Sequence, residues 1–168
     1  MDAGFFLWFG TFAQSLIGTY GYVGLFAVNL IGSATIILPL LPGFLFVFAF
    51  GATLDPWLIA LSAGAGAALG ELTGYAVGKG GGAVLEWKHN SWLKRAEKWS
   101  NSHGIFPVIF IFAATPLPAD VIGILAGVID YDVKRFLLAS FLGKFVQFAI
   151  LAWAGFYSLS WILPYFGF

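Results

Sequence analysis

Four polar side chains lie in parts of this sequence that are otherwise apolar, and they are the residues best placed to do chemistry. Glu71 lies in a segment rich in small residues, and Asp120 follows Pro118. Lys144 and Gln147 lie one helical turn apart in a long apolar segment. An ionisable group at membrane depth costs roughly 3 kcal/mol or more unless it is paired or faces water. Each of these groups therefore needs a partner or a function.

Each of the three charged residues also has a plainer interpretation. Glu71 precedes Lys79 by about two turns and could form a hydrogen bond near the end of a helix. Asp120 could cap the first turn of a helix, because aspartate accepts from free backbone N–H groups there. Lys144 could pair with Asp120 or with Glu71, bind a phosphate as a compact cation, or extend to the membrane interface.

Other chemistries find no support in the sequence. The chain has no cysteine, and His89 and His103 have no partner at metal-ligand spacing. The glycines around Lys79 lack the spacing of a phosphate-binding loop, and no catalytic triad pattern is present. A formal net charge of zero argues against a nucleic-acid partner. We expect no metal, no cofactor and no enzymatic activity.

The composition is typical of a protein that resides in a lipid membrane. Hydrophobic residues make up 60% of the 168 residues, charged residues make up 10%, and the mean hydropathy is +0.91. A soluble domain carries roughly a quarter charged residues. We therefore predict an all-α integral membrane protein that forms a single membrane domain over residues 1–168, because only helices and closed barrels satisfy their backbone in lipid.

The first half of the sequence predicts one short helix, one hairpin and one crossing. Residues 1–19 are too short to span and predict an interfacial N-terminal helix. The following apolar block, up to residue 53, is broken by Pro39, Pro42 and Gly43 and is too short to cross twice. It predicts a re-entrant helical hairpin with its tip at those three residues. Asp55 and Pro56 then begin a helix to about Gly78 that is long enough to span.

The second half repeats this plan after a basic segment. Residues 79–103 predict an amphipathic connector rich in Lys and Trp that lies at the membrane surface. The apolar block at 104–128 is broken by Pro116 and Pro118 and predicts a second re-entrant hairpin. Asp130 and Asp132 are expected to shape a turn. A long transmembrane helix then runs from Val133 to about Leu163.

Charge and self-similarity predict how these parts are oriented. All eight basic residues follow position 78, so the connector 79–103 and residues 130–135 should be cytoplasmic in a multi-pass protein of the cell membrane. Lys134 and Arg135 could attract lipid headgroups or serve only as a topology signal. A shift of 76 positions aligns repeats 20–78 and 104–168. Each repeat has an odd number of crossings, so the second would be inverted, as in many transporters.

These residues resemble the DedA superfamily, also called the VTT or SNARE-associated family. The similar motifs in the first half are the run from Pro39 to Gly43, Gly51, the run from Gly70 to Tyr75, and Gly78, Lys79 and Gly81. In the second half they are the run from Phe112 to Pro118 and Gly127. The resemblance covers about residues 20–158. It implies paired re-entrant hairpins and, for several members, translocation of polyprenyl phosphates or phospholipids.

The sequence departs from the better-known bacterial members at several positions. Those relatives carry acidic residues where this chain has Gly32 or Ser33 and Phe44. They also carry arginines around the second hairpin, where Ala113 to Thr115 stand here. The resemblance therefore does not extend to the residues through which those relatives would couple to protons.

The leading hypothesis is a flippase or scramblase that moves a lipid or a polyprenyl phosphate between leaflets. Asp120, Glu71, Lys144 and Gln147 would form its polar path. One alternative is a proton- or ion-coupled transporter of small solutes that uses the same acids. Another is a membrane scaffold without transport. The expected partners are membrane lipids, with protons as a possible coupling ion and a second copy of the chain as a possible homodimer partner.

Overall fold

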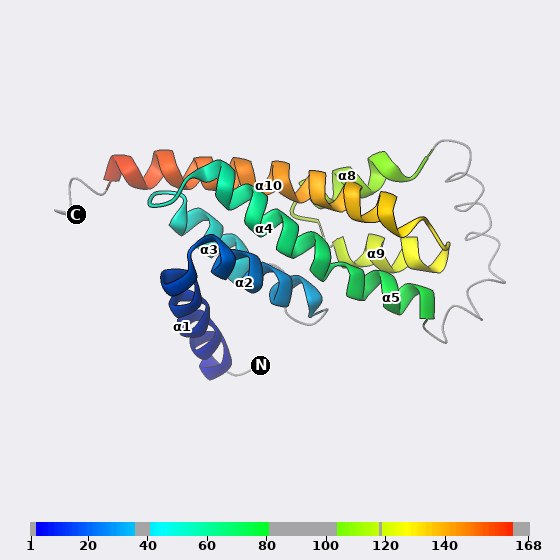
Figure 1. Cartoon of the computed structure of the whole chain (residues 1–168), viewed down its shortest axis with the longest axis horizontal. Coiled ribbons are helices and arrows are strands. Elements are labelled where there is room, and N and C mark those ends of the chain that lie inside the picture. Colours follow the sequence, from blue (N-terminus) through cyan, green and yellow to red (C-terminus); the bar gives the residue numbers. More distant parts are fainter. Residues whose placement is uncertain (1–2, 36–40, 81–103, 118, 163–168) are drawn as a thin grey trace.

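The regular structure of the protein is helical throughout the part that the computed structural model describes, residues 3–35, 41–80, 104–117 and 119–162 (Figure 1). This confirms the predicted all-α class. The helices are α1 (Ala3–Tyr20), α2 (Tyr22–Ala34), α3 (Leu41–Phe50), α4 (Pro56–Gly70), α5 (Leu72–Gly80), α8 (Phe106–Ala114), α9 (Ala119–Val128) and α10 (Val133–Ile162). Most of the predicted connector, residues 81–103, lies outside the described residues.

The N-terminal segment is a helix, as predicted, and it packs on the rest of the protein along one face. Phe9, Ala13 and Ile17 are buried at helical spacing on α1. Gly21 has a φ of +55°, a backbone conformation that suits glycine, and it separates α1 from α2. Gly24 of α2 lies directly against the backbone of α1. The interfacial position of α1 stays a prediction.

The first predicted hairpin corresponds to the helix pair α2 and α3, but two of the three residues expected at its tip belong to α3. Pro42 and Gly43 are the second and third residues of α3 rather than part of the turn. Proline is tolerated there because the first turn of a helix leaves its N–H groups without intrahelical partners. Pro39 lies outside the described residues. A side chain at Gly43 would collide with the Asn29 side chain of α2.

The predicted helix after Asp55 begins as expected and is then interrupted. The Asp55 carboxylate accepts hydrogen bonds from the N–H groups of Trp57 and Leu58, and Pro56 is the first helical residue. The chain leaves regular helix at Glu71, where α4 ends and α5 starts. The two helices continue end to end, α4 beside α10 and α5 beside α9 (Figure 1). Helix α5 also runs through Lys79 and Gly80, beyond the expected end at about Gly78.

The second predicted hairpin corresponds to α8 and α9. Pro116 lies in the turn between these helices, as predicted, whereas Pro118 lies outside the described residues. Asp120 is the second residue of α9 and not the residue before it. The expected cap position is therefore shifted into the helix, and its side chain lies outside the described part of the structure.

The turn between α9 and α10 is shaped by Asp130 and Asp132, as predicted. Asp130 has a φ of +53°, and its N–H donates to the carbonyl of Gly127 while the N–H of Tyr131 donates to that of Ala126. This is the Schellman pattern that ends a helix, with aspartate where glycine is commonest. Asp132 then begins α10, because its carboxylate accepts from the backbone N–H of Arg135 at 2.8 Å.

The predicted last crossing is confirmed as a helix, α10, of 30 residues. Its segment Val133–Ser158 is the one helix in the described residues that is long and apolar enough to cross a membrane. Leu138, Leu142, Val146 and Ile150 form an exposed apolar stripe with a spacing of four residues along it.

One helix of each pair packs against a helix of the other half of the sequence, α3 on α10 and α9 on α5. Gly155 of α10 lies against the backbone of Phe48 in α3. Gly78 of α5 lies against the backbone of Ile124 in α9. The pair α2/α3 and the pair α8/α9 occupy opposite ends of the molecule, and the C-terminal ends of α2 and α8 both point towards its middle (Figure 1).

Candidate functional site

The buried carboxylate of Glu71 lies where α4 meets α5. Its side chain is 2% exposed. The helix before it consists largely of small residues, so neighbouring backbones approach closely and leave little room for water. A side chain at Gly70, for example, would collide with the last turn of α2 at Leu30 and Ala34. The packing that buries Glu71 is thus a direct result of the small-residue pattern in the sequence.

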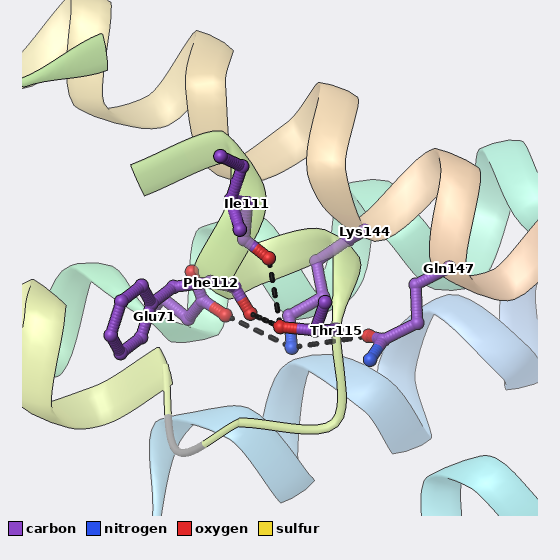
Figure 2. Close-up of polar contacts among 6 residues, drawn as sticks. All are labelled: Glu71, Ile111, Phe112, Thr115, Lys144 and Gln147. Carbon is purple, nitrogen blue, oxygen red and sulfur yellow. Dashed lines mark hydrogen bonds and ion pairs between the residues drawn. The ribbon is translucent and has the colours of Figure 1, made fainter. Parts of the chain in front are cut away.

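Lys144 of α10 is the partner of this carboxylate. Its ammonium nitrogen lies 3.2 Å from a carboxylate oxygen of Glu71 and 3.5 Å from the amide oxygen of Gln147 (Figure 2). The second distance is at the long limit for a hydrogen bond. Sequence analysis left open whether Lys144 pairs with Glu71 or with Asp120, and the structure brings it to Glu71. Glu71, Lys144 and Gln147 therefore belong to one site.

Ser140 is a fourth member of this site that sequence analysis missed. Ser140, Lys144 and Gln147 are spaced as i, i+4 and i+7 along α10, so they lie on one face of the helix. All three are buried. The spacing of Ser140 from Lys144 was a signal present in the sequence, but a serine in an apolar helix does not stand out as a charged residue does. We call Glu71, Ser140, Lys144 and Gln147 the polar cluster.

The polar cluster separates two hydrophobic cores. One core combines α1 to α4 with the second half of α10, where Phe148 and Ala152 are buried. The other combines α5, α8 and α9 with the beginning of α10, where Phe136 and Ala139 are buried. The cluster lies between these two stretches of α10. It is therefore central along the molecule as well as buried.

The ends of both helix pairs approach the residues next to this cluster. Thr73, two residues after Glu71, donates its hydroxyl hydrogen to the carbonyl of Ala34, the last residue of α2. Gly143, next to Lys144, lies against Ala113 and Ala114 at the end of α8. Thr115 follows α8 and turns its hydroxyl back to the helix, donating to the carbonyls of Ile111 and Phe112 (Figure 2). The breaks in both helix pairs thus lie beside the polar cluster.

Helix α9, which carries Asp120, also approaches the cluster. A side chain at Gly123 would contact the backbone carbonyl of Glu71 and the N–H of Tyr75. The role of Asp120 itself stays a prediction, because its side chain is not among those described.

Asn29 of α2 is another polar residue that sequence analysis missed. It is buried against Gly43, and its amide donates to the carbonyl of Leu25 at 2.8 Å.

The remaining charged candidates lie at the surface. Lys134 and Arg135 are exposed in the first turn of α10. Lys79 forms a 2.7 Å ion pair with Asp130, and this hydrogen-bonded carboxylate raises the pKa of the lysine above its usual value. Within the described residues no group of three or more His, Cys, Asp or Glu side chains could hold a metal ion.

Comparison with known proteins gives one match. The family model for the VTT domain, the domain of the DedA/SNARE-associated family, matches residues 41–157. No curated protein and no solved structure matches the chain. The match covers more than half of the sequence, including α4, most of α10 and all four residues of the polar cluster. The chain therefore belongs to the VTT domain family, whose proteins are associated with membranes.

Proposed function

We propose that this protein is a DedA-type transporter that moves a lipid or a polyprenyl-phosphate carrier between the two leaflets of the cell membrane. The observation that carries the proposal is the buried polar cluster around the Glu71–Lys144 pair, placed beside the breaks of two helix pairs. Ionisable groups inside a membrane protein commonly mark the path of a substrate. A polar lipid headgroup needs such a path, whereas its chains can remain in lipid.

We infer that the two halves form the predicted inverted repeat with two re-entrant hairpins. The support is reciprocal packing. Phe48 of the first half lies against Gly155 of α10, and Ile124, which is 76 positions after Phe48, lies against Gly78 of α5. One helix of each pair thus packs on a helix of the other repeat, α3 on α10 and α9 on α5. In transporters built from inverted repeats, the broken elements meet at the binding site near the midplane.

The repeat gives a physical route for a headgroup. Two hairpins that enter from opposite faces would shorten the distance between the aqueous phases, and the polar cluster would lie at the point where they meet. Asp120 in α9 would extend this path from the second hairpin. Lys134 and Arg135 would attract anionic headgroups at the cytoplasmic surface. No enzymatic step is part of this proposal.

A liposome assay tests the function. The purified chain is reconstituted with a fluorescent phospholipid or a labelled polyprenyl phosphate, and exchange between leaflets is measured with a membrane-impermeant quencher. We expect faster exchange than in protein-free liposomes. The double variant Glu71→Gln, Lys144→Met should lose most of this activity, whereas Lys79→Met, which removes a lysine from an exposed ion pair, should retain it.

The alternatives give different results in the same liposomes. No acceleration with any of several lipids would refute the proposal. Solute or ion flux that follows an imposed pH gradient, without lipid movement, would instead support a coupled solute transporter. A scaffold predicts that neither lipids nor ions move and that variants of the polar cluster have no phenotype in cells.

A further inference from the structure

Five aromatic rings follow one another along the seam between α4 and α10, and we call them the aromatic ladder. Four of them lie on one face of α10 at every fourth position, with one position skipped: Phe141, Phe145, Trp153 and Tyr157. The skipped position is Ala149, which is buried and carries no ring. The fifth ring, that of Trp57 in α4, contacts both Phe145 and Trp153 and so bridges the interval.

The rings of the ladder are in contact from one end to the other. The centroids of Phe141 and Phe145 are 6.3 Å apart, and those of Trp153 and Tyr157 are 5.5 Å apart. The Trp57 centroid lies 6.1 Å from that of Phe145 and 5.9 Å from that of Trp153. These distances fall within the range of about 4.5–7 Å in which aromatic pairs attract one another. The ladder is therefore an ordered strip of ring surface to which both halves of the sequence contribute.

The ladder leads from the level of the polar cluster towards the C-terminal end of the long helix. Phe141 and Phe145 flank Lys144 in the sequence, and Tyr157 lies 16 residues beyond Phe141, or roughly 24 Å along the helix axis. One leaflet contributes about half of a hydrocarbon core of roughly 30 Å. The ladder is thus long enough to cover the depth of one leaflet. It lies on the half of α10 that is away from its basic first turn.

The surface around the ladder suits a partner that is uncharged and apolar. No charged side chain follows Lys144 in α10, and α4 contains none. Trp57 is 54% exposed and Tyr157 is 67% exposed, whereas the other three rings are partly buried. Rings that are supported by neighbouring rings offer many dispersion contacts to a chain laid along them. These features fit the hydrocarbon chain of a lipid.

We propose that the aromatic ladder binds a hydrocarbon chain of a membrane lipid in the leaflet away from Lys134 and Arg135. This deepens, and rests on, the proposed lipid-transport function, because it fixes where the chain lies while the headgroup approaches the polar cluster. The headgroup lies at the Tyr157 end, since tyrosine suits the membrane interface. The chain follows the rings towards Phe141 and stays at the lipid-exposed surface of the protein.

The ladder also distinguishes the two leaflets. Ala65, Leu69 and Val77 lie 76 positions before three of the rings, so the first repeat has no counterpart of the ladder at those positions. The opposite end of α10 carries the exposed charges of Lys134 and Arg135 instead. The transported lipid is therefore held by its chain in one leaflet and by its headgroup in the other.

Photochemical labelling in liposomes tests the ladder. The full chain is reconstituted with a trace of phosphatidylcholine whose chain carries an aryl diazirine, and labelled residues are located by mass spectrometry after illumination. Ile150 is the matched reference for bulk lipid contact, because it lies one turn from Trp153 and is 66% exposed. Phe12 of α1, which is 41% exposed, is the reference for ring reactivity. We expect Trp153 and Phe145 to carry several times more label than either reference, although both are only partly exposed.

Two double variants separate ring contact from apolar packing. Trp57→Leu, Trp153→Leu keeps the seam apolar but breaks the ladder, whereas Trp57→Phe, Trp153→Phe keeps a ring at each position. Lipid exchange by the leucine variant should be at least about fivefold slower, because the ring surface along which the chain lies is lost. Label on Phe145 should fall in the same variant. The phenylalanine variant should retain most of the exchange and most of the label.

The outcomes separate this site from the proposed function. Enrichment of label on the ladder without lipid exchange would refute the proposed function and leave the chain site standing. Label that follows exposure, with Ile150 above Phe145 and Trp153, overturns the site. Absence of label from the ladder also overturns it, as when a second copy of the chain covers this face, and so does normal exchange by the leucine variant. If that variant does not fold, the labelling of the original chain decides.

Discussion

The Glu71–Lys144 ion pair stabilises the fold only while both charges are present. Removing one partner leaves an uncompensated charge in a site that is almost completely buried. Such a change costs about 3–5 kcal/mol in other proteins, whereas replacing both partners by neutral groups is often nearly neutral. We expect Lys144→Met to be strongly destabilised and the double variant Glu71→Gln, Lys144→Met to recover most of the loss. Denaturant unfolding in detergent micelles measures both.

A cycle of the two single variants and the double variant is the control for this prediction. If the two single changes have small effects that simply add in the double variant, the charges do not interact and the pair is not a structural unit.

The exposed pair between Lys79 and Asp130 should respond to alkaline pH. The pKa of Lys79 is raised above its ordinary value of 10.5, chiefly by the hydrogen bond with Asp130. Its stabilising contribution is therefore complete below about pH 10.5 and is lost as the pH rises through the higher folded value. Unfolding measured against pH should show a decline in that range. The decline should be absent in Lys79→Met.

The backbone at Asp130 gives a prediction that does not depend on charge. Its φ of +53° lies in the left-handed region, where aspartate and asparagine are tolerated better than most residues. Asp130→Asn should keep this conformation, whereas Asp130→Ala should lose about 1 kcal/mol more. Thermal unfolding of the two variants tests it, since both lose the ion pair. Equal stabilities of the two variants would mean that the left-handed conformation at position 130 is no less favourable for alanine than for asparagine.

The residues of the site were only partly predictable from sequence. Glu71 and Lys144 stand out because a charge in an apolar segment demands a partner, but the sequence did not decide whether that partner of Lys144 was Glu71 or Asp120. Ser140 was missed because serine is common and uncharged, and its importance depends on burial that only the folded structure reveals.

Helix α10 gives a prediction at the scale of the element. Ile150 lies on its exposed apolar stripe, well inside the helix, whereas Leu138 is also exposed but lies one turn from Lys134. A lysine at the centre of a membrane span costs about 2.5–3.5 kcal/mol, and one near the end can extend to the interface. Ile150→Lys should therefore reduce membrane insertion much more than Leu138→Lys. Alkaline extraction of cell membranes measures the difference.

The contact between α5 and α9 depends on glycine. A side chain at Gly127 would collide with the backbone of Tyr75 and Lys79, whereas one at Gly10 of α1 would meet open space. Gly127→Ala should therefore lower the melting temperature by several degrees, because packed backbones cannot yield without moving whole helices. Gly10→Ala should leave it unchanged or raise it slightly, since alanine favours helix.

Element boundaries followed the sequence closely where local signals were strong. Asp55 with Pro56, and Asp132 before α10, began helices as capping chemistry predicts. The interruption at Glu71 was not predicted, because Gly70 and Gly74 were interpreted as positions for close helix packing and not as weak points of the helix. Pro42 and Gly43 were predicted at the tip of the first hairpin because Pro42 was interpreted as a helix breaker. A proline is also tolerated in the first turn of a helix, which is where Pro42 lies.

The fold class and the order of the helices could be predicted from the sequence, but the arrangement of the helices in space could not. Low charge and broken apolar blocks predicted an all-α protein with two helix pairs, and the described residues bear this out. The reciprocal packing of α3 on α10 and of α9 on α5 could not be read from the sequence, because weak self-similarity does not say which elements touch. That packing depends on glycines scattered across both halves.

If the two halves form an inverted repeat, equivalent glycines should be equally sensitive. Gly51 and Gly127 are 76 positions apart, and a side chain at either would collide with a backbone carbonyl of the other half, that of Ala152 or of Tyr75. We expect Gly51→Ala and Gly127→Ala to lower the melting temperature and the rate of lipid exchange to a similar extent. A large difference between them in both measurements would contradict the repeat.

The position of the polar cluster between two hydrophobic cores also bears on cooperativity. Two cores divided by a polar layer could melt one after the other, as separate domains do. Here α10 runs unbroken through both, and its two ends are packed in different cores. Losing one core would leave half of that helix without support and would uncover the Glu71–Lys144 charges. The two cores should therefore unfold together, and heating should produce a single calorimetric transition.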